Sequence, residues 1–160
     1  MYINEKNIVH ADIAARNILV TISNEPNVRY AAKIGDLGLS KSLQSQQIYY
    51  QSTSGAFAVK WSAPVCIHFV NLLIFQEVAE YGKFSLQTDI WSFGVTLFEI
   101  FSLGQIPYAY VPNEEIGLKI KQGHRLAQPE LCPDDVYKMM LEMWNLNPKG
   151  IKLKRKILSG

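Results

Sequence analysis

The sequence predicts a mainly α-helical fold with a few short β-strands. Between residues 86 and 146, apolar positions recur at helical spacing, and helix start and stop signals punctuate them. Before position 36, apolar residues instead come in short runs that polar turns separate, as strands do. The chain has 160 residues, of which 48% are hydrophobic and 19% charged. This composition is typical of a globular domain large enough to bury a core.

Two short strands are expected near the N-terminus, at 18–21 and 30–34, joined by a turn over 23–27 that is rich in Ser, Asn and Pro. The following residues, 36–60, are polar and contain the adjacent pair Tyr49 and Tyr50. We predict a long, mobile loop there, and a loop of that length is usually functional or disordered.

Three helices are expected in the second half of the chain. Segment 89–102 is apolar nearly all round, which indicates a buried central helix. A second helix opens at Asn113 and ends near Gly123, with acidic residues at its start and lysines in its last turns. Pro133 suits the first turn of a third helix, which runs to about Trp144. Its apolar residues have helical spacing and are expected to pack in the core: Met139, Met140, Met143 and Trp144.

Charge and hydropathy exclude some classes of partner. The net charge of +2 comes from 16 basic and 14 acidic residues. The basic excess lies near the C-terminus, so we expect no nucleic-acid-binding surface and interpret 150–160 as a basic tail. No apolar run reaches the roughly 18–20 residues of a membrane helix, so no membrane segment is expected in this chain. Cys66 and Cys132 form no metal-binding pattern, which favours a reduced, intracellular setting.

Two acids and an amide form the strongest candidate for a chemical site. Asp12 and Asn17 share one loop, and Asp36 follows the second predicted strand. Phosphoryl transfer needs one acid for the proton of the attacking hydroxyl, and an amide and a second acid for Mg²⁺. The predicted hairpin between the two segments returns Asp36 to the side of Asn17. The simpler alternative is that both acids are turn residues that cap strands.

These segments resemble the catalytic loop and the metal-binding Asp-Phe-Gly motif of protein-tyrosine kinases. Ala14-Ala15-Arg16 has the form found in tyrosine kinases. Segment 59–64 is similar to the loop that ends the kinase activation segment, and 88–95 to the buried helix that follows. The adjacent tyrosines and segment 38–41 lean towards the spleen-tyrosine-kinase type. The resemblance implies a C-terminal kinase lobe without the N-terminal lobe, a partial kinase domain over 1–149.

The resemblance implies a role for each motif residue. Asp12 is expected to be the catalytic acid/base, and Arg16 to orient both Asp12 and the substrate tyrosine. Asn17 and Asp36 are expected to ligate Mg²⁺, and Leu19 to lie beneath the adenine ring of ATP.

Other roles concern the substrate and regulation. Lys60 and Trp61 are expected to bind the substrate. Tyr49 and Tyr50 are expected to be phosphorylated, although they could be merely exposed loop tyrosines.

Further expectations concern the base of the catalytic loop. Asp89 is expected to tether its backbone, and His10 to stack with Leu37 in an apolar column. Ala11 stands where the family has the Arg that pairs with a phosphorylated activation loop.

Two departures from the family pattern affect the expected activity. The chain starts just before the catalytic loop, so the Gly-rich loop, the strand lysine and its glutamate partner are absent. The isolated chain is therefore expected to be inactive. Residues 65–76 separate Pro64 from Glu77, which the family joins directly. This non-family insertion is either a genuine apolar insertion or an unspliced intron.

The resemblance implies that the complete protein is a protein-tyrosine kinase. It would transfer the γ-phosphate of ATP to tyrosines of protein substrates, in the cytoplasm or in the cytoplasmic portion of a receptor. Two alternatives remain open: a non-catalytic, kinase-like interaction module, and a truncated gene model.

Overall fold

The computed structural model describes residues 2–51, 57–67 and 82–146. Most of the insertion at 65–76, Glu77 after it, and the basic tail therefore lie outside the described residues. No helix in the described ranges is long and apolar enough to span a bilayer. The elements in chain order are α1 (Tyr2–Glu5), β1 (Ile8–Val9), η1 (Ala15–Asn17), β2 (Ile18–Ile22), β3 (Tyr30–Ile34), β4 (Lys41–Ser42), β5 (Tyr50–Gln51), η2 (Val59–Trp61), β6 (Lys83–Phe84), α2 (Leu86–Phe101), α3 (Asn113–Lys121) and α4 (Asp134–Met143), where η marks a 3-10 helix.

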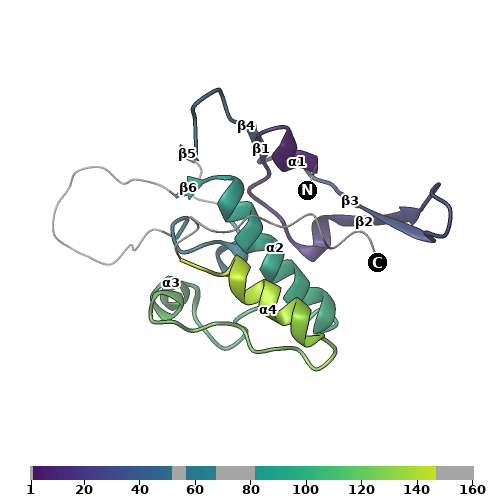
Figure 1. Ribbon diagram of the computed structural model, residues 1–160. Coiled ribbons are helices and arrows are strands. Elements are labelled where there is room, and N and C mark those ends of the chain that lie inside the picture. Colours follow the sequence, from purple (N-terminus) through teal and green to yellow (C-terminus); the bar gives the residue numbers. More distant parts are fainter. Residues whose placement is uncertain (1, 52–56, 68–81, 147–160) are drawn as a thin grey trace.

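The predicted hairpin is confirmed. Strands β2 and β3 pair antiparallel, from Ile18 opposite Ile34 to Ile22 opposite Tyr30. Asn27 has a φ of 65° in the connecting turn, a left-handed conformation that Asn tolerates well. The hairpin projects away from the helices (Figure 1). Its open end lies next to residues 10–17, which resemble a kinase catalytic loop and are called the catalytic loop below.

The prediction of a continuous loop over 36–60 is wrong in part. Strand β4 pairs with β1, and β5 pairs with β6, which lies more than thirty residues further along the chain. Leu43, directly after β4, and Tyr50, in β5, are buried in the core, each 8% exposed. Two-residue ladders of this kind leave no periodic signal, because the partner strand and not the local sequence decides them.

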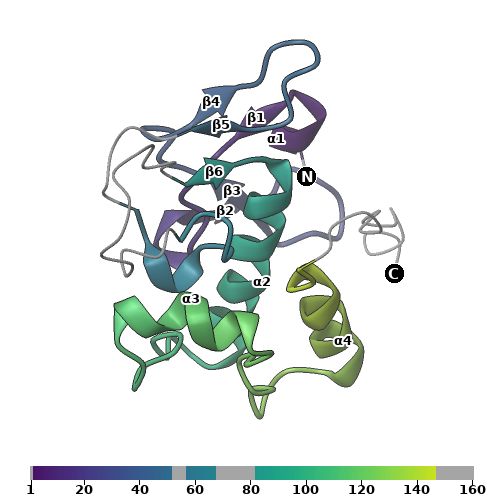
Figure 2. The ribbon, with the colours of Figure 1, turned by 90° about the vertical axis from the view of Figure 1, so that its left-hand side faces the viewer.

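Helix α2 is the central element, as its apolar sequence predicted. It begins at Leu86 with a capping box: the Ser85 hydroxyl accepts from the Thr88 N–H at 3.3 Å, and the Thr88 hydroxyl accepts from the Ser85 N–H at 3.0 Å. In Figure 2, α2 lies between the paired strands β1 and β4 and the helices α3 and α4. Its position allows side chains of one helix to reach both the catalytic loop and the remaining helices.

Helix α4 packs closely on α2. Met140, Met143 and Trp144 are at most 2% exposed, which confirms their predicted place in the core. The approach is closest at Gly94, where an added Cβ would lie 2.7 Å from the Trp144 indole nitrogen. A side chain larger than hydrogen at this position would force the two helices apart.

Helix α3 also agrees with its prediction. Glu114 and Glu115 lie in its first turn and Lys119 and Lys121 in its last, which suits the helix dipole. Gly123 then adopts a φ of 98°, which ends the helix at a residue without a Cβ. Ile116 and Ile120 face the core and are at most 1% exposed.

The end of α2 offers a test of backbone strain. Leu103 follows the helix with a φ of 57°, is 81% exposed, and occupies a position where Gly is usual. Leu103→Gly is expected to stabilise the protein by about 1 kcal/mol, because left-handed backbone costs other residues that much. Thermal unfolding should show a Tm rise of about 2–4 °C. Ile106→Gly, at a 62% exposed position without positive φ, is the control and should not raise the Tm.

Candidate active site

A buried carboxylate on α2 anchors the start of the catalytic loop. The Asp89 side chain is 1% exposed and accepts from two consecutive backbone groups. The His10 N–H donates to Oδ2 at 2.7 Å, and the Ala11 N–H donates to Oδ1 at 2.9 Å. The expected tether is thus present. It also holds Ala11 at a φ of 65°, a strained conformation for a residue with a Cβ.

Burial makes this tether sensitive to pH. It raises the pKa of the Asp89 carboxyl from 3.8 to about 6, although the N–H bonds from His10 and Ala11 oppose the rise. Between pH 3.8 and 6, the folded protein therefore holds the proton more tightly than the unfolded chain does. The contribution of Asp89 to the free energy of unfolding is expected to rise by about 3 kcal/mol as the pH falls through this window, at about 1.4 kcal/mol per pKa unit.

Urea unfolding of the wild type and Asp89→Asn, from pH 7 down to pH 4, measures this contribution. The wild type should gain stability relative to the variant as the pH falls. If the difference in free energy of unfolding between the wild type and Asp89→Asn did not change with pH, the pKa of Asp89 would be the same in the folded and unfolded protein.

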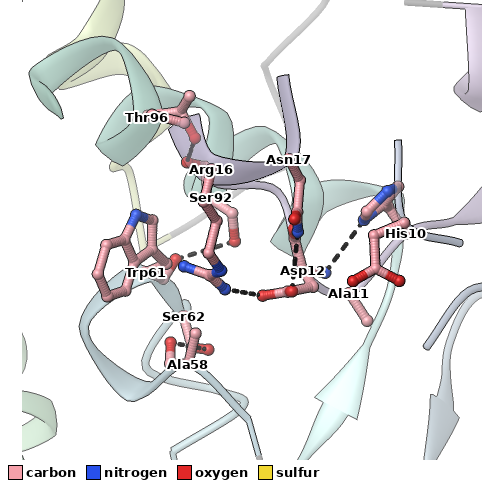
Figure 3. Close-up of polar contacts among 12 residues, drawn as sticks. His10, Ala11, Asp12, Arg16, Asn17, Ala58, Trp61, Ser62, Ser92 and Thr96 are labelled. Carbon is pink, nitrogen blue, oxygen red and sulfur yellow. Dashed lines mark hydrogen bonds and ion pairs between the residues drawn. The ribbon is translucent and has the colours of Figure 1, made fainter. Parts of the chain in front are cut away.

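Asp12, Arg16 and Asn17 form one hydrogen-bonded group. Asn17 Nδ2 donates to the Asp12 backbone oxygen at 2.7 Å and to Asp12 Oδ2 at 2.8 Å. Arg16 forms an ion pair with the other carboxylate oxygen of Asp12. Figure 3 shows the Asp12 carboxylate between the side chains of Arg16 and Asn17. The 3-10 turn η1 creates this geometry, because it brings positions 16 and 17 back towards position 12.

The hairpin returns Asp36 to this group. The Gly35 N–H donates to the Asn17 backbone oxygen at 2.8 Å, and His10 Nε2 lies 3.0 Å from the Gly35 oxygen. Asp36 is exposed and has a φ of 56°. Strained backbone of this kind is found most often at functional sites. The backbones at 17 and 36 are thus adjacent, as the sequence predicted.

The donor atoms at 17 and 36 suit a hard cation. Asn17 uses its Nδ2 for both bonds to Asp12, which leaves its amide oxygen without a partner among the described residues. Within the same residues, the Asp36 carboxylate accepts only from the Gly38 N–H, at 3.2 Å. Mg²⁺ prefers such oxygen ligands and usually keeps water and substrate phosphates as further ligands. Within the described ranges, no three His, Cys, Asp or Glu side chains converge on one point. The residues therefore fit Mg²⁺ bound together with phosphate, and not a closed protein cage.

Only one of the two expected substrate residues lies at this group. The Trp61 ring lies under the Arg16 guanidinium, whose central carbon is 5.1 Å from the ring centroid. Lys60 instead donates from Nζ to the Tyr108 backbone oxygen at 3.2 Å. Leu19 lies on β2, where its side chain is 60% exposed and touches the Gly35 position.

The adjacent tyrosines have different environments. Tyr49 is 40% exposed, and Lys83 Nζ lies 5.0 Å from its ring centroid. Tyr50 stacks on Phe84 and donates its hydroxyl to the Leu39 backbone oxygen at 3.2 Å. Burial raises the pKa of Tyr50 to about 12. Tyr50 is thus not the exposed loop residue that the polar sequence suggested, because the β5–β6 pair turns it inward.

The expected stack of His10 with Leu37 is not formed. His10 is fully buried, whereas Leu37 is 58% exposed. A turn closed by the Ser40 N–H on the Leu37 oxygen carries Leu37 away from the core, and no described element covers it.

A cavity of about 620 Å³ lies apart from these residues. Its lining comes from the segment around Tyr49, the start of α2 and the end of α4, and does not include Asp12, Asn17 or Asp36. Of these three residues, Asp36 is exposed, Asp12 keeps 17% of its side chain exposed, and Asn17 is buried.

Sequence reasoning missed Glu99. Its Oε2 accepts from the Ala15 N–H at 2.9 Å and from Trp61 Nε1 at 2.7 Å. The available signal was an acid within a helix that is apolar nearly all round, since such acids are rarely buried without partners.

Comparison with known proteins agrees with this geometry. The family model described as protein tyrosine and serine/threonine kinase matches residues 1–152. The chain belongs to this kinase family. The motif residues Asp12, Asn17 and Asp36 all lie within the matched range, as does the whole part of the kinase chain that the structure describes.

Curated relatives of the kinase chain are tyrosine kinases. It is 41% identical over 150 residues to the tyrosine-protein kinase transforming protein Fps of avian sarcoma virus (strain PRCII), covering 92% of the chain and 24% of the relative. It is 41% identical to the tyrosine-protein kinase SYK of Gallus gallus, covering 91% and 21%, and 42% identical to the tyrosine-protein kinase ZAP-70 of Mus musculus, covering 89% and 20%. The kinase chain thus spans less than a quarter of the length of these relatives.

Proposed function

We propose that the chain is the C-terminal lobe of a protein-tyrosine kinase catalytic domain. In the complete protein, this lobe transfers the γ-phosphate of ATP to tyrosine hydroxyls of protein substrates. The observation that carries the proposal is the Asp12 carboxylate between Arg16 and Asn17, with the Trp61 ring beside it (Figure 3). The tyrosine-kinase relatives support the choice of tyrosine as the acceptor.

Asp12 acts as the general base. Its two hydrogen bonds orient the carboxylate, and 17% exposure leaves it accessible to a substrate hydroxyl. The tyrosine oxygen attacks the γ-phosphorus, the bond to the β,γ-bridging oxygen breaks, ADP leaves, and the phenolic proton passes to Asp12. Arg16 holds Asp12 in place and presents its remaining N–H groups towards the substrate. Leu19, exposed on β2, offers an apolar surface for the adenine ring.

Asn17 and Asp36 would hold Mg²⁺ through the amide oxygen and the carboxylate. Bound there, the ion neutralises charge on the transferring phosphate. Asp36 lies two residues after the end of β3, next to Gly35, whose N–H donates to the Asn17 backbone oxygen.

The substrate segment docks beside Trp61, with Lys60 at its edge once Lys60 leaves the Tyr108 oxygen. Tyr49 is the better phosphorylation site of the tyrosine pair, because Tyr50 must first leave Phe84 and Leu39. ATP and protein substrates of this kind imply a cytoplasmic location, either free or on the inner side of a membrane.

A phosphotransfer assay tests the proposal. The complete protein is incubated with Mg-ATP labelled at the γ-phosphate and with a tyrosine-containing polymer; a serine-containing polymer is the matched control. Label should appear on tyrosine only, and chelation of Mg²⁺ should abolish it. A folded protein that labels neither polymer, yet binds protein partners, would instead be a kinase-like interaction module.

A further inference from the structure

One carboxylate oxygen of α2 joins two parts of the chain that are remote from each other in sequence. Oε2 of Glu99 accepts from the Ala15 N–H in the catalytic loop and from the Trp61 indole N–H in the candidate substrate segment. The two bonds measure 2.9 Å and 2.7 Å. Because both donors meet at the same atom, Glu99 sets the distance between the two segments and does not merely attach each to the helix.

A second contact from the same helix fixes the other end of Trp61. The Ser92 hydroxyl is within donating distance of two backbone oxygens, that of Trp61 at 2.9 Å and that of Thr88 at 3.1 Å, and the Trp61 oxygen is the nearer. Ser92 and Glu99 are seven residues apart, about two helical turns, and so lie on one face of α2. This face therefore holds Trp61 at both the backbone and the ring, which leaves the ring little freedom to rotate.

The fixed ring in turn supports the candidate base. Trp61 lies under the Arg16 guanidinium at 5.1 Å, and Arg16 pairs with Asp12. The contacts thus run without a break from Glu99 through Trp61 and Arg16 to Asp12, and Figure 3 shows the last three side chains in this order. Nothing else described in the structure accepts from the Trp61 indole N–H.

We infer that Glu99 is a positioning residue, which holds Trp61 against Arg16 and thereby fixes Asp12 relative to the docked substrate. The inference rests on the proposed phosphotransfer. Glu99 touches neither candidate metal ligand, so its removal acts on the tyrosine substrate and not on the nucleotide. Its charge strengthens both bonds, since hydrogen bonds to an ionised acceptor are roughly twice as strong as neutral ones.

Three variants at position 99 separate the effect of side-chain length from the effect of side-chain charge. Glu99→Ala removes the shared acceptor, Glu99→Gln keeps an acceptor oxygen at the same reach, and Glu99→Asp shortens the reach. Glu114→Ala, at an exposed position in the first turn of α3, is the control for loss of a helical glutamate. All are made in the complete protein, with kcat and KM measured for a tyrosine peptide and for ATP.

Glu99→Ala and Glu99→Asp should raise the KM for the peptide and lower its kcat, with kcat/KM falling about tenfold or more, because small misplacements of reacting groups are costly. The KM for ATP should not change. Glu99→Gln should restore kcat/KM to within about threefold of the wild type, since it retains both hydrogen bonds. Trp61→Phe keeps an aromatic ring at this position but removes the indole N–H, so it should cause little further loss when combined with Glu99→Ala.

A parallel fall in kcat and thermal stability, with both KM values unchanged, would reduce Glu99 to a structural residue and overturn the inference. Full additivity of Glu99→Ala and Trp61→Phe would do the same. If the wild type transfers no phosphate, the proposed function fails. The NMR resonance of the Trp61 indole N–H then tests by itself whether Glu99 positions Trp61. That resonance should shift in Glu99→Ala and return in Glu99→Gln; an unchanged resonance would overturn it.

Discussion

Asp12→Asn is expected to lower phosphotransfer by the complete protein by about 10²–10⁴-fold, the usual contribution of a general base. The variant keeps the shape of the side chain but cannot take the proton of the tyrosine hydroxyl. It also disturbs its neighbours, because Arg16 and Asn17 each donate to a different Asp12 oxygen, and an amide has only one oxygen. Steady-state kcat with a tyrosine polymer and Mg-ATP measures the effect.

Asp135→Asn is the matched control for Asp12→Asn. This acid is exposed in the first turn of α4, so the same chemical change there should leave kcat within about twofold, as is usual for surface substitutions. The melting temperatures of both variants should stay close to that of the wild type. If Asp12→Asn kept more than about a tenth of the activity, Asp12 could not be the general base.

Trp144→Ala is expected to destabilise the protein by about 3–5 kcal/mol, the usual cost of removing a large buried aromatic side chain. Trp144 is fully buried between α4 and α2, next to Gly94. Since a domain has only about 5–15 kcal/mol of stability, this loss would remove a large fraction of the free energy of unfolding. Urea unfolding followed by circular dichroism gives the free-energy difference.

Trp144→Phe separates ring volume from the indole N–H. That N–H is buried without a hydrogen-bond partner among the described residues, so its removal leaves no donor unsatisfied. The Phe variant should lose less than about half of the free energy of unfolding that the Ala variant loses, because its ring refills most of the space. Equal losses for the two variants would mean that the position is held by something other than packing against α2.

Local patterns were sufficient to predict the regular elements. The β2–β3 hairpin and the three long helices follow from apolar spacing, turn residues and caps, all of which act over a few positions. The spacing of Asp12 and Asn17, and the return of Asp36 by the hairpin, could be predicted for the same reason. Each of these features depends on a short stretch of chain, so the local sequence is enough to predict it.

Remote contacts could not be predicted in this way. The sequence showed two adjacent polar-loop tyrosines, but the β5–β6 pair buried one and left the other exposed. Likewise, nothing near Lys60 indicated that it would bind the Tyr108 backbone. The apolar helix around Glu99 indicated that this acid has partners, but not which residues, 84 and 38 positions away, they are.

The sequence by itself determined the family, the helices, the hairpin and the identity of the chemical groups. Only the tertiary structure decided that Glu99 meets both Ala15 in the catalytic loop and Trp61, and that Lys60 meets the Tyr108 backbone. The physical reason is that side-chain type and local periodicity are properties of neighbours in the chain. A hydrogen bond between distant residues depends instead on how α2 packs against everything around it.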